Sequence, residues 1–213
     1  MKQSGSGYKI LKKFNSGSRP LPKIKKLISD VDGYLSLREA GLLYLLARYG
    51  PCKGAVVEIG TYKGRATMCL AQGVKDRGEG KVFTIDPFKD FWTSNPDNPR
   101  LLFKAGLAKR EFLENIRKVS LKKYIKLFTA TSKKASRGWR MPIRLLWIDG
   151  RHEYKYVKKD FKCWEPFVSR GGIIAFHDIR FEGPKTVIFE NISDTGRFKD
   201  IVVVDDILIV SKR

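Results

Sequence analysis

Histidine and cysteine are scarce in this sequence. Two of its 213 residues are histidine and three are cysteine. The cysteines, Cys52, Cys69 and Cys163, are odd in number and far apart, so they match neither a disulfide framework nor the spacing of zinc ligands. No apolar run approaches the ~18 residues of a transmembrane helix, and no apolar signal core stands near the start. We therefore expect a cytoplasmic protein without a transmembrane segment.

Acidic residues are also few, with 22 Asp and Glu against 43 Lys and Arg, so the formal net charge is +21. The excess is concentrated in residues 1–26 and 104–140. Such a field attracts nucleic acids, anionic membranes or anionic small molecules, although a solvated lysine-rich surface is the more ordinary cause. No zinc finger, basic zipper or RNA-recognition sequence accompanies it. The charge leaves nucleic acid open as a partner without a motif behind it.

Strand-like and helix-like patterns alternate along most of the chain. We predict a basic flexible arm over residues 1–20 and one α/β domain over 21–213 that begins with a helical segment. Strands are predicted at 55–60, 81–87, 125–131, 143–150, 171–178 and, as a hairpin, within 200–212; the segments 101–119, 156–168 and 184–192 read as helices, and 88–100 as a loop.

This alternation predicts a doubly wound, mostly parallel sheet of the Rossmann-like kind. The final hairpin turns near Asp205-Asp206. It must add an antiparallel last strand, because a tight turn cannot join parallel neighbours.

Polar residues follow the first two predicted strands, where sheets of this kind bind ligands. In EIGTYKG, residues 58–64, Gly60 and Gly64 let the backbone approach a ligand closely. The stretch is not the GxGxxG of dinucleotide-binding folds, and its leading acid suits a cationic ligand better than a pyrophosphate. Asp86, after the second strand, is placed to accept hydrogen bonds from ribose hydroxyls. A plain turn between a strand and a helix explains each feature taken alone.

Both histidines stand beside aspartates at the ends of later predicted strands. IDGRHEY contains Asp149 and His152, and GGIIAFHDI contains His177 and Asp178. Two strand ends that each carry an Asp and a His indicate a site. The ordinary alternatives are a surface histidine that caps the next helix for His152, and a buried histidine bonded to the backbone for His177.

Three strings together resemble the class I S-adenosylmethionine-dependent methyltransferases. They are VVEIGTYKGRAT, VFTIDPF and LLWIDGRHEYKYVKKDFKCWEPFVSRGGIIAFHD. Within that class the likeness is to the cephalosporin-hydroxylase-like and macrolide-sugar O-methyltransferases. The resemblance implies a seven-stranded sheet with an antiparallel last strand. It also implies cofactor contacts from Glu58, Gly60, Thr61 and Gly64 to the methionine part, from Asp86 to the ribose, from Ser132 or Thr131 near the adenine, and from Asp149.

The same resemblance implies a divalent metal, because related O-methyltransferases often hold one with residues after the fourth and fifth strands. Here these would be Asp149, His177 and Asp178, a set that suits Mg²⁺ or Mn²⁺. A general base is proposed in relatives three residues after the first acid, where this chain has His152. Many relatives have two acids, or an acid and an amide, where His177-Asp178 stands. Adjacent strand residues point to opposite faces, so one of the two can face the core or the cofactor instead.

The chemistry stands without the resemblance. An acceptor hydroxyl must lose its proton when it attacks a sulfonium methyl group. A metal lowers the pKa of the hydroxyl, and a histidine can take the proton. Together with the resemblance, His152 and Asp149 above all predict an O-methyltransferase that acts on a small hydroxylated acceptor, such as a sugar or natural product, which could be anionic. The resemblance also implies a homo-oligomer.

Two other functions remain open on the sequence. A nucleic-acid methyltransferase or binding protein would use the basic surface, but IDGRHEY stands where amino-methylating nucleic-acid enzymes commonly carry an Asn/Asp-Pro-Pro-aromatic string. A different Rossmann-like enzyme, such as a nicotinamide-dependent oxidoreductase, is disfavoured by the absence of GxGxxG.

Overall fold

The structure is a computed structural model that describes residues 21–89, 91–92, 102–103, 105–193 and 195–213. The predicted basic arm over residues 1–20 and most of the predicted loop over 88–100 lie outside the described residues.

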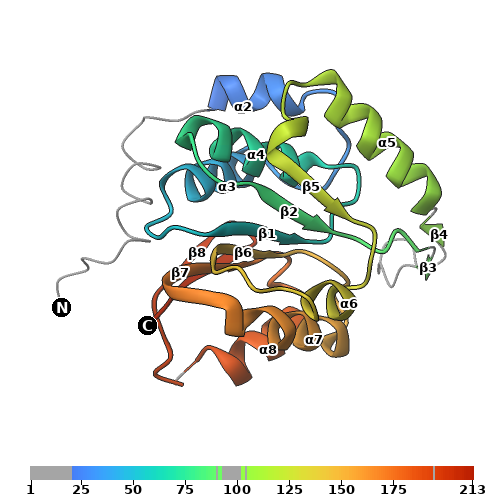
Figure 1. The fold of residues 1–213 in the computed structure, drawn as a ribbon. Helices are drawn as coiled ribbons and strands as arrows, with labels where there is room; N and C mark the ends of the chain where they lie inside the picture. The colour runs from blue at the N-terminus through green and yellow to red at the C-terminus, as the bar shows by residue number, and fades with distance from the viewer. Residues whose placement is uncertain (1–20, 90, 93–101, 104, 194) are drawn as a thin grey trace.

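Seven strands form one sheet in the order β5-β2-β1-β6-β7-β9-β8 (Figure 1). The five strands β5, β2, β1, β6 and β7 pair in parallel, each with its neighbour in this order. Strand β9 pairs antiparallel with both β7 and β8. The doubly wound sheet and its antiparallel last strand are thereby confirmed. The strand bounds are β1 (Ala55–Ile59), β2 (Val82–Ile85), β5 (Ile125–Phe128), β6 (Ile143–Ile148), β7 (Val168–Phe176), β8 (Phe198–Val204) and β9 (Ile207–Lys212).

Helices cover both faces of this sheet (Figure 1). One face carries α2 (Leu21–Ile28), α3 (Leu37–Tyr49), α4 (Arg65–Arg77) and α5 (Ala105–Lys118), and the other carries α6 (Ser132–Ser136), α7 (Tyr154–Trp164) and α8 (Glu182–Asn191). Two short 3-10 turns, η1 (Lys122–Tyr124) and η2 (Glu165–Phe167), complete the layers. None of the helices in the described part of the chain is long and apolar enough to cross a membrane.

The strand side chains alternate between two apolar cores. In β6, Leu145 and Trp147 join the core beneath α3 and α4, while Leu146 and Ile148 join the core beneath α7 and α8. Because both faces are buried, the parallel strands read as nearly continuous apolar runs. The pattern that predicted these strands therefore has its cause in the two helical layers.

Three local features differ from the sequence predictions. The helical segment predicted at the start of the domain is two helices, α2 and α3, separated by residues 29–36. Arg65 holds the connection between them by donating to the carbonyls of Ile28, Val31 and Leu35. The strands β3 (Phe91–Trp92) and β4 (Leu102–Phe103) form a separate antiparallel pair. Helix α6 is the third feature. Strands β3 and β4 have two residues each and α6 has five, and elements this short cannot be recognised from the periodicity of apolar residues.

Candidate active site

The predicted site residues lie beyond the carboxyl ends of adjacent strands. Asp86 follows β2, Gly60 follows β1, Asp149 follows β6 and His177 follows β7, and these four strands are neighbours in the sheet. The parallel arrangement thus gathers them along one edge, where doubly wound sheets bind their ligands.

The turn after β1 fits tightly against the end of β6. Gly60 has φ +90°, and a Cβ there would lie 1.9 Å from the backbone oxygen of Asp149. Gly64 also has φ +90°, and its Cβ would lie 2.8 Å from the Phe112 ring. A side chain at Gly60 would collide with rigid backbone, so the close approach of β1 and β6 requires glycine.

Asp86 holds this turn from the side of β2. Its Oδ2 accepts hydrogen bonds from the backbone N–H groups of Thr61 at 2.9 Å and Tyr62 at 3.2 Å. Its Oδ1 accepts from the N–H of Phe88 at 2.7 Å. The Thr61 hydroxyl is bonded to Thr84. A carboxylate has about four acceptor positions, so Asp86 retains capacity for a further donor such as a ribose hydroxyl.

Glu58 lies beneath the turn rather than on its surface. Its side chain is fully buried, and its Oε2 accepts from the Thr67 hydroxyl at 2.6 Å. Burial raises the pKa of Glu58 to about 8, although hydrogen bonds from Thr67 and Thr84 oppose the rise. A pKa in that range favours the protonated form near neutrality. Its Oε1 has no hydrogen-bond partner among the described residues.

Ser132 is bonded inward, to α7. Its hydroxyl accepts from the Trp164 indole N–H at 2.8 Å and is also bonded to Asp160, a buried carboxyl. Burial raises the pKa of Asp160 to about 6, against the bond from Ser132. The neighbouring Thr131 is exposed and caps α6 by accepting from the N–H of Lys134 at 3.3 Å. Ser132 thus fixes the loop after β5, while Thr131 faces outward.

The four residues of the two Asp–His pairs meet in one cluster. His177 Nδ1 lies 3.1 Å from Asp149 Oδ1 and 3.3 Å from Asp178 Oδ2. His152 Nε2 lies 2.8 Å from the same Asp178 oxygen. Asp178 has φ +54°, which takes the chain out of strand geometry immediately after β7. The opposite-face rule for adjacent strand residues therefore does not separate His177 from Asp178.

Charge balance in this cluster is set by its two histidines. Burial acts to raise the pKa of Asp178, but the hydrogen bonds from His152 and His177 outweigh it and hold that pKa well below its usual range. Burial acts to lower the pKa of His177, yet the charge of Asp149 and bonds to the carboxylates raise it. The pKa of His152 is also raised, because Asp178 overcomes the effect of burial.

Asp149 is the less compensated carboxylate of the pair. Burial raises its pKa, and the nearby charge of Asp178 adds to the rise, whereas His177 and His152 oppose it. Its side chain is 23% exposed, against 9% for Asp178. Asp149 is therefore the carboxylate that a ligand can reach more directly.

A third carboxylate, Glu39 on α3, reaches the cluster from a distant part of the sequence. It is 3% exposed, and its Oε1 lies 3.5 Å from His177 Nε2. Burial would raise its pKa, but the nearby imidazole of His177 and bonds from the N–H groups of Ser36 and Asp206 lower that pKa to about 2. Sequence reasoning missed this residue. Ser36-Leu-Arg-Glu39 carries a capping-box signal, which predicts a helix start but no contact with the site.

A possible metal set differs from the predicted one by a histidine. Asp149, His152 and Asp178 each offer a ligand atom within 4.8 Å of the others, the one such group found among the described residues. The predicted third ligand, His177, touches both aspartates but turns its Nε2 toward Glu39. Two carboxylates and an imidazole fit Mg²⁺ or Mn²⁺. The ligand roles stay predictions.

The match to known sequences decides the family. Residues 57–179 fit the family model Methyltransf_24, a methyltransferase domain, over more than half of the chain. The chain belongs to this methyltransferase family. The resemblance to class I S-adenosylmethionine-dependent methyltransferases is thereby confirmed.

Solved methyltransferases share this fold at low sequence identity. The O-methyltransferase NovP is 17% identical, with a TM-score of 0.64 over 92% of this chain and 80% of its own. TomG of Streptomyces achromogenes, an O-methyltransferase of tomaymycin synthesis solved with S-adenosylmethionine, is 14% identical, with a TM-score of 0.62 over 90% and 88%. PaMTH1 of Podospora anserina, a methyltransferase solved with S-adenosylhomocysteine, is 13% identical, with a TM-score of 0.65 over 100% and 97%. The likeness establishes the fold.

A curated relative adds similarity without a function. The uncharacterized protein y4gI of Sinorhizobium fredii is 29% identical over 124 residues, which are 58% of this methyltransferase and 13% of that protein. The chain thus spans a small part of the relative's length.

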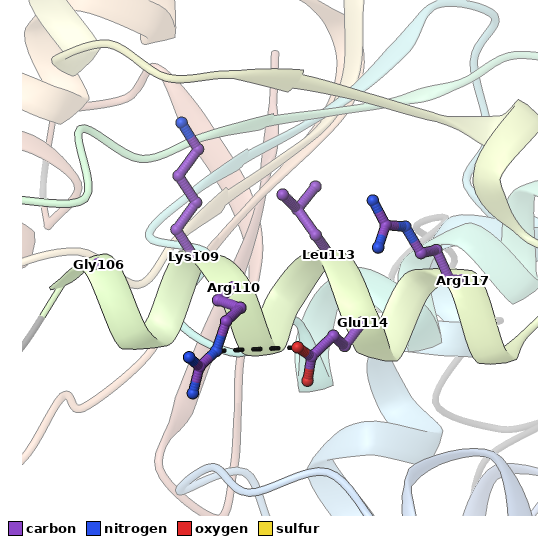
Figure 2. A pocket seen from close by; sticks show the side chains of 6 residues that line it. All are labelled: Gly106, Lys109, Arg110, Leu113, Glu114 and Arg117. Atoms are coloured by element: carbon purple, nitrogen blue, oxygen red, sulfur yellow. Dashed lines mark ion pairs between the residues drawn. The ribbon is translucent and has the colours of Figure 1, made fainter.

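A separate hollow lies along α5. Figure 2 shows Lys109, Leu113 and Arg117 projecting from one side of the helix, while Arg110 and Glu114 form an ion pair of 3.8 Å. With Gly106 these residues line a hollow of about 290 Å³. None of the predicted site residues lines it.

Proposed function

We propose that this methyltransferase transfers the methyl group of S-adenosylmethionine to a hydroxyl of a small acceptor, such as a sugar or a natural product. The observation that carries the proposal is the contact of 2.8 Å between His152 Nε2 and Asp178 Oδ2, beside Asp149 at the carboxyl edge of the sheet. The neighbours NovP and TomG, both described as O-methyltransferases, support it by their fold.

His152 has the geometry of a general base. Its side chain is 39% exposed, so an acceptor can reach it, and its ring stacks on Phe181 with centroids 4.9 Å apart. Asp178 accepts from one ring nitrogen and so orients the other, which is the way a carboxylate prepares an imidazole to take a proton. The acceptor hydroxyl would give its proton to His152 as its oxygen forms the bond to the methyl carbon and the sulfur leaves.

A divalent metal held by Asp149, His152 and Asp178 is the second arrangement that the cluster supports. Such an ion would lower the pKa of the acceptor hydroxyl. His152 Nε2 faces Asp178, and it can bind a metal or share a proton with that carboxylate, but not both at once. The two arrangements therefore predict different behaviour for the same substitution.

The cofactor would lie across the turn after β1. Gly60 and Gly64 let it approach the backbone, and Asp86 has an acceptor position left for its ribose. Glu58, buried and largely protonated, would support the turn from below instead of pairing with the cofactor's charge. The roles of Thr61, Ser132 and Asp149 toward the cofactor remain part of this proposal.

The first experiment is a calorimetric titration of S-adenosylhomocysteine into the protein, with Mg²⁺ and then with EDTA. We expect binding in both conditions, and a metal-dependent change in affinity if the second arrangement holds. Absence of binding in either condition would contradict the proposed function.

The second experiment tests His152 by its pH dependence. A panel of sugar nucleotides and catechols supplies acceptors, and methyl transfer is followed with labelled cofactor. Since the pKa of His152 is raised, the rate should increase as pH rises through a value above 6.5. His152→Gln should lose this inflection and about 10²- to 10⁴-fold in rate. Lys155→Ala, an exposed neighbour on α7, is the matched control.

The same variant separates the two arrangements. If His152 is a base, His152→Gln binds Mg²⁺ or Mn²⁺ as the native protein does. If His152 is a ligand, metal affinity falls together with the rate. A steep salt dependence of RNA binding with no transfer to any small acceptor would instead favour the nucleic-acid alternative.

A further inference from the structure

Glu39 makes more contacts than a helix cap requires. Its Oε2 accepts from the N–H of Ser36 at 2.8 Å, and its own N–H donates to the Ser36 hydroxyl at 3.2 Å, which completes the capping box of α3. Its other oxygen has no part in that box. Oε1 accepts from the N–H of Asp206 at 3.1 Å and faces His177 at 3.5 Å. The two oxygens thus serve two separate purposes.

His177 is enclosed by carboxylates on both sides of its ring. Nδ1 faces Asp149 and Asp178, and Nε2 faces Glu39. The ring is buried and lies 5.3 Å from the Trp147 ring, centroid to centroid. Rotation about its side-chain bonds would take one of the nitrogens away from its carboxylate. A carboxylate of α3 lies at the ring nitrogen opposite the two aspartates, at ion-pair distance.

The position of Glu39 is itself fixed at three points. The box at Ser36 holds it to α3, the Asp206 N–H holds it to the turn between β8 and β9, and Arg65 anchors the segment that leads into α3. These contacts link the N-terminal helices and the final hairpin to the carboxyl end of β7. A carboxylate held in this way can fix a histidine from behind.

We propose that Glu39 is a positioning residue, which holds the His177 imidazole with Nδ1 directed at Asp149 and Asp178. This inference rests on the proposed function, because it assigns Glu39 to the same site. Mutation of a residue that contacts and orients a functional histidine typically lowers activity or metal affinity about 10- to 100-fold.

Two single substitutions separate positioning from capping. Glu39→Gln keeps a residue that can serve at this place in a capping box, but its single carbonyl oxygen cannot accept at both Ser36 and Asp206. Ser36→Ala removes only the hydroxyl that accepts from the Glu39 N–H; the Ser36 backbone N–H still donates to Glu39 Oε2, so the carboxylate keeps facing His177. Ser36→Ala should lower the free energy of unfolding by about 1 kcal/mol and leave the site unchanged.

The readout exploits the two histidines of the chain, whose side-chain ¹⁵N signals can be assigned with His152→Gln. Glu39→Gln should shift the His177 signals and lower kcat for the best acceptor of the panel by about 10- to 100-fold, with S-adenosylhomocysteine affinity retained. Ser36→Ala should change neither. If Glu39→Gln does not fold, Glu39→Asp, whose shorter side chain withdraws the carboxylate from His177, is measured with the same expectation.

Unchanged His177 signals in the Glu39 variant, with a stability loss like that of Ser36→Ala, would overturn the inference and leave Glu39 a helix cap. The proposed function fails on a different result, namely a native protein that does not bind S-adenosylhomocysteine. Since the histidine signals are measured without an acceptor, the inference is decided even if no acceptor of the panel is methylated.

Discussion

The two ends of strand β6 differ in whether their buried charged side chains have partners. Just beyond its carboxyl end, Asp149 lies 3.1 Å from His177 within a network of carboxylates and imidazoles. Near its start, Arg144 is 1% exposed, and its Nε and both Nη atoms lack a hydrogen-bond partner in the described part of the chain. The pairing of β6 with both neighbouring strands changes register beside Arg144.

The electrostatic surroundings explain why this difference matters. Burial and, to a smaller extent, the like charge of Arg77 lower the pKa of Arg144 to about 10. A Cβ at Gly50, directly after α3, would lie 3.2 Å from Arg144 Nη1, so the guanidinium lies beside the C-terminal end of this helix, which favours a cation. At the other end of the strand, each charge depends on a partner. Removal of one group should therefore have opposite consequences at the two ends.

His177→Leu should give the largest effect. It removes the imidazole shared by Asp149, Asp178 and Glu39 and leaves buried carboxylates without that partner. Loss of one member of a buried ion pair costs about 3–5 kcal/mol, and we expect that fall in the free energy of unfolding, measured by urea denaturation. A loss below about 1 kcal/mol would mean that the carboxylates adopt neutral forms instead of relying on His177.

Glu58 is a third case of a buried ionisable group. Unlike the carboxylates near His177, it has no cationic partner among the described residues and is expected to take up a proton instead. Its folded pKa of about 8 lies above the ordinary 4.5, so the folded state keeps a proton that the unfolded chain releases. The free energy of unfolding should therefore fall as pH rises from about 4.5 to 8, by roughly 1.4 kcal/mol per pH unit at most.

The measurement compares native protein with Glu58→Gln by urea denaturation at pH 5 and pH 8. Between these two pH values the free energy of unfolding of the variant should fall less than that of the native protein, by on the order of 3 kcal/mol. The histidines contribute equally to both proteins, so the difference between the two slopes isolates Glu58. Parallel slopes would mean that Glu58 is ionised in the folded state.

Arg144→Met should act in the opposite direction from His177→Leu. Methionine fills a similar space without a charge, and replacement of buried charge by apolar atoms is often neutral or stabilising by about 1–4 kcal/mol. We expect an unchanged or raised urea midpoint. A clear loss of stability would show that Arg144 has a partner, such as ordered water, that compensates its burial.

The smallest effect is expected at the surface. Arg110 and Glu114 on α5 form an exposed pair at 3.8 Å (Figure 2). Arg110→Ala should cost about 0.3–0.5 kcal/mol at low salt, as exposed pairs one helical turn apart do. The difference should vanish in 1 M NaCl, where charges are screened within about 3 Å. A cost that persists in salt would indicate packing of the Arg110 stem.

Much of the fold could be predicted because its causes are local. Apolar runs such as IRLLWI in β6 report burial on both faces, and the tight turn at Asp205-Asp206 forces an antiparallel strand. The residues after each strand, including Gly60 and Asp86, could be placed at one edge because parallel strands all end there. These inferences need only the order of the elements.

The contacts that depend on packing between distant segments could not be predicted. Glu39 and His177 are far apart in sequence, and no pattern in either segment indicates that α3 begins beside the end of β7. Ser132 was expected near the cofactor, but its bond to Trp164 requires the relative position of α6 and α7. The positive φ of Asp178, which brings it beside His177, is likewise fixed by surrounding structure.

The left-handed backbone at Asp178 also limits which amino acids this position can accept. Among residues with a side chain, asparagine and aspartate adopt such a conformation most readily. Asp178→Asn would keep the turn but lose the charge that faces both histidines, whereas Asp178→Glu would keep the charge but strain the turn. Backbone geometry and chemistry therefore select the same amino acid, and a homologue that varies here should have altered both histidines as well.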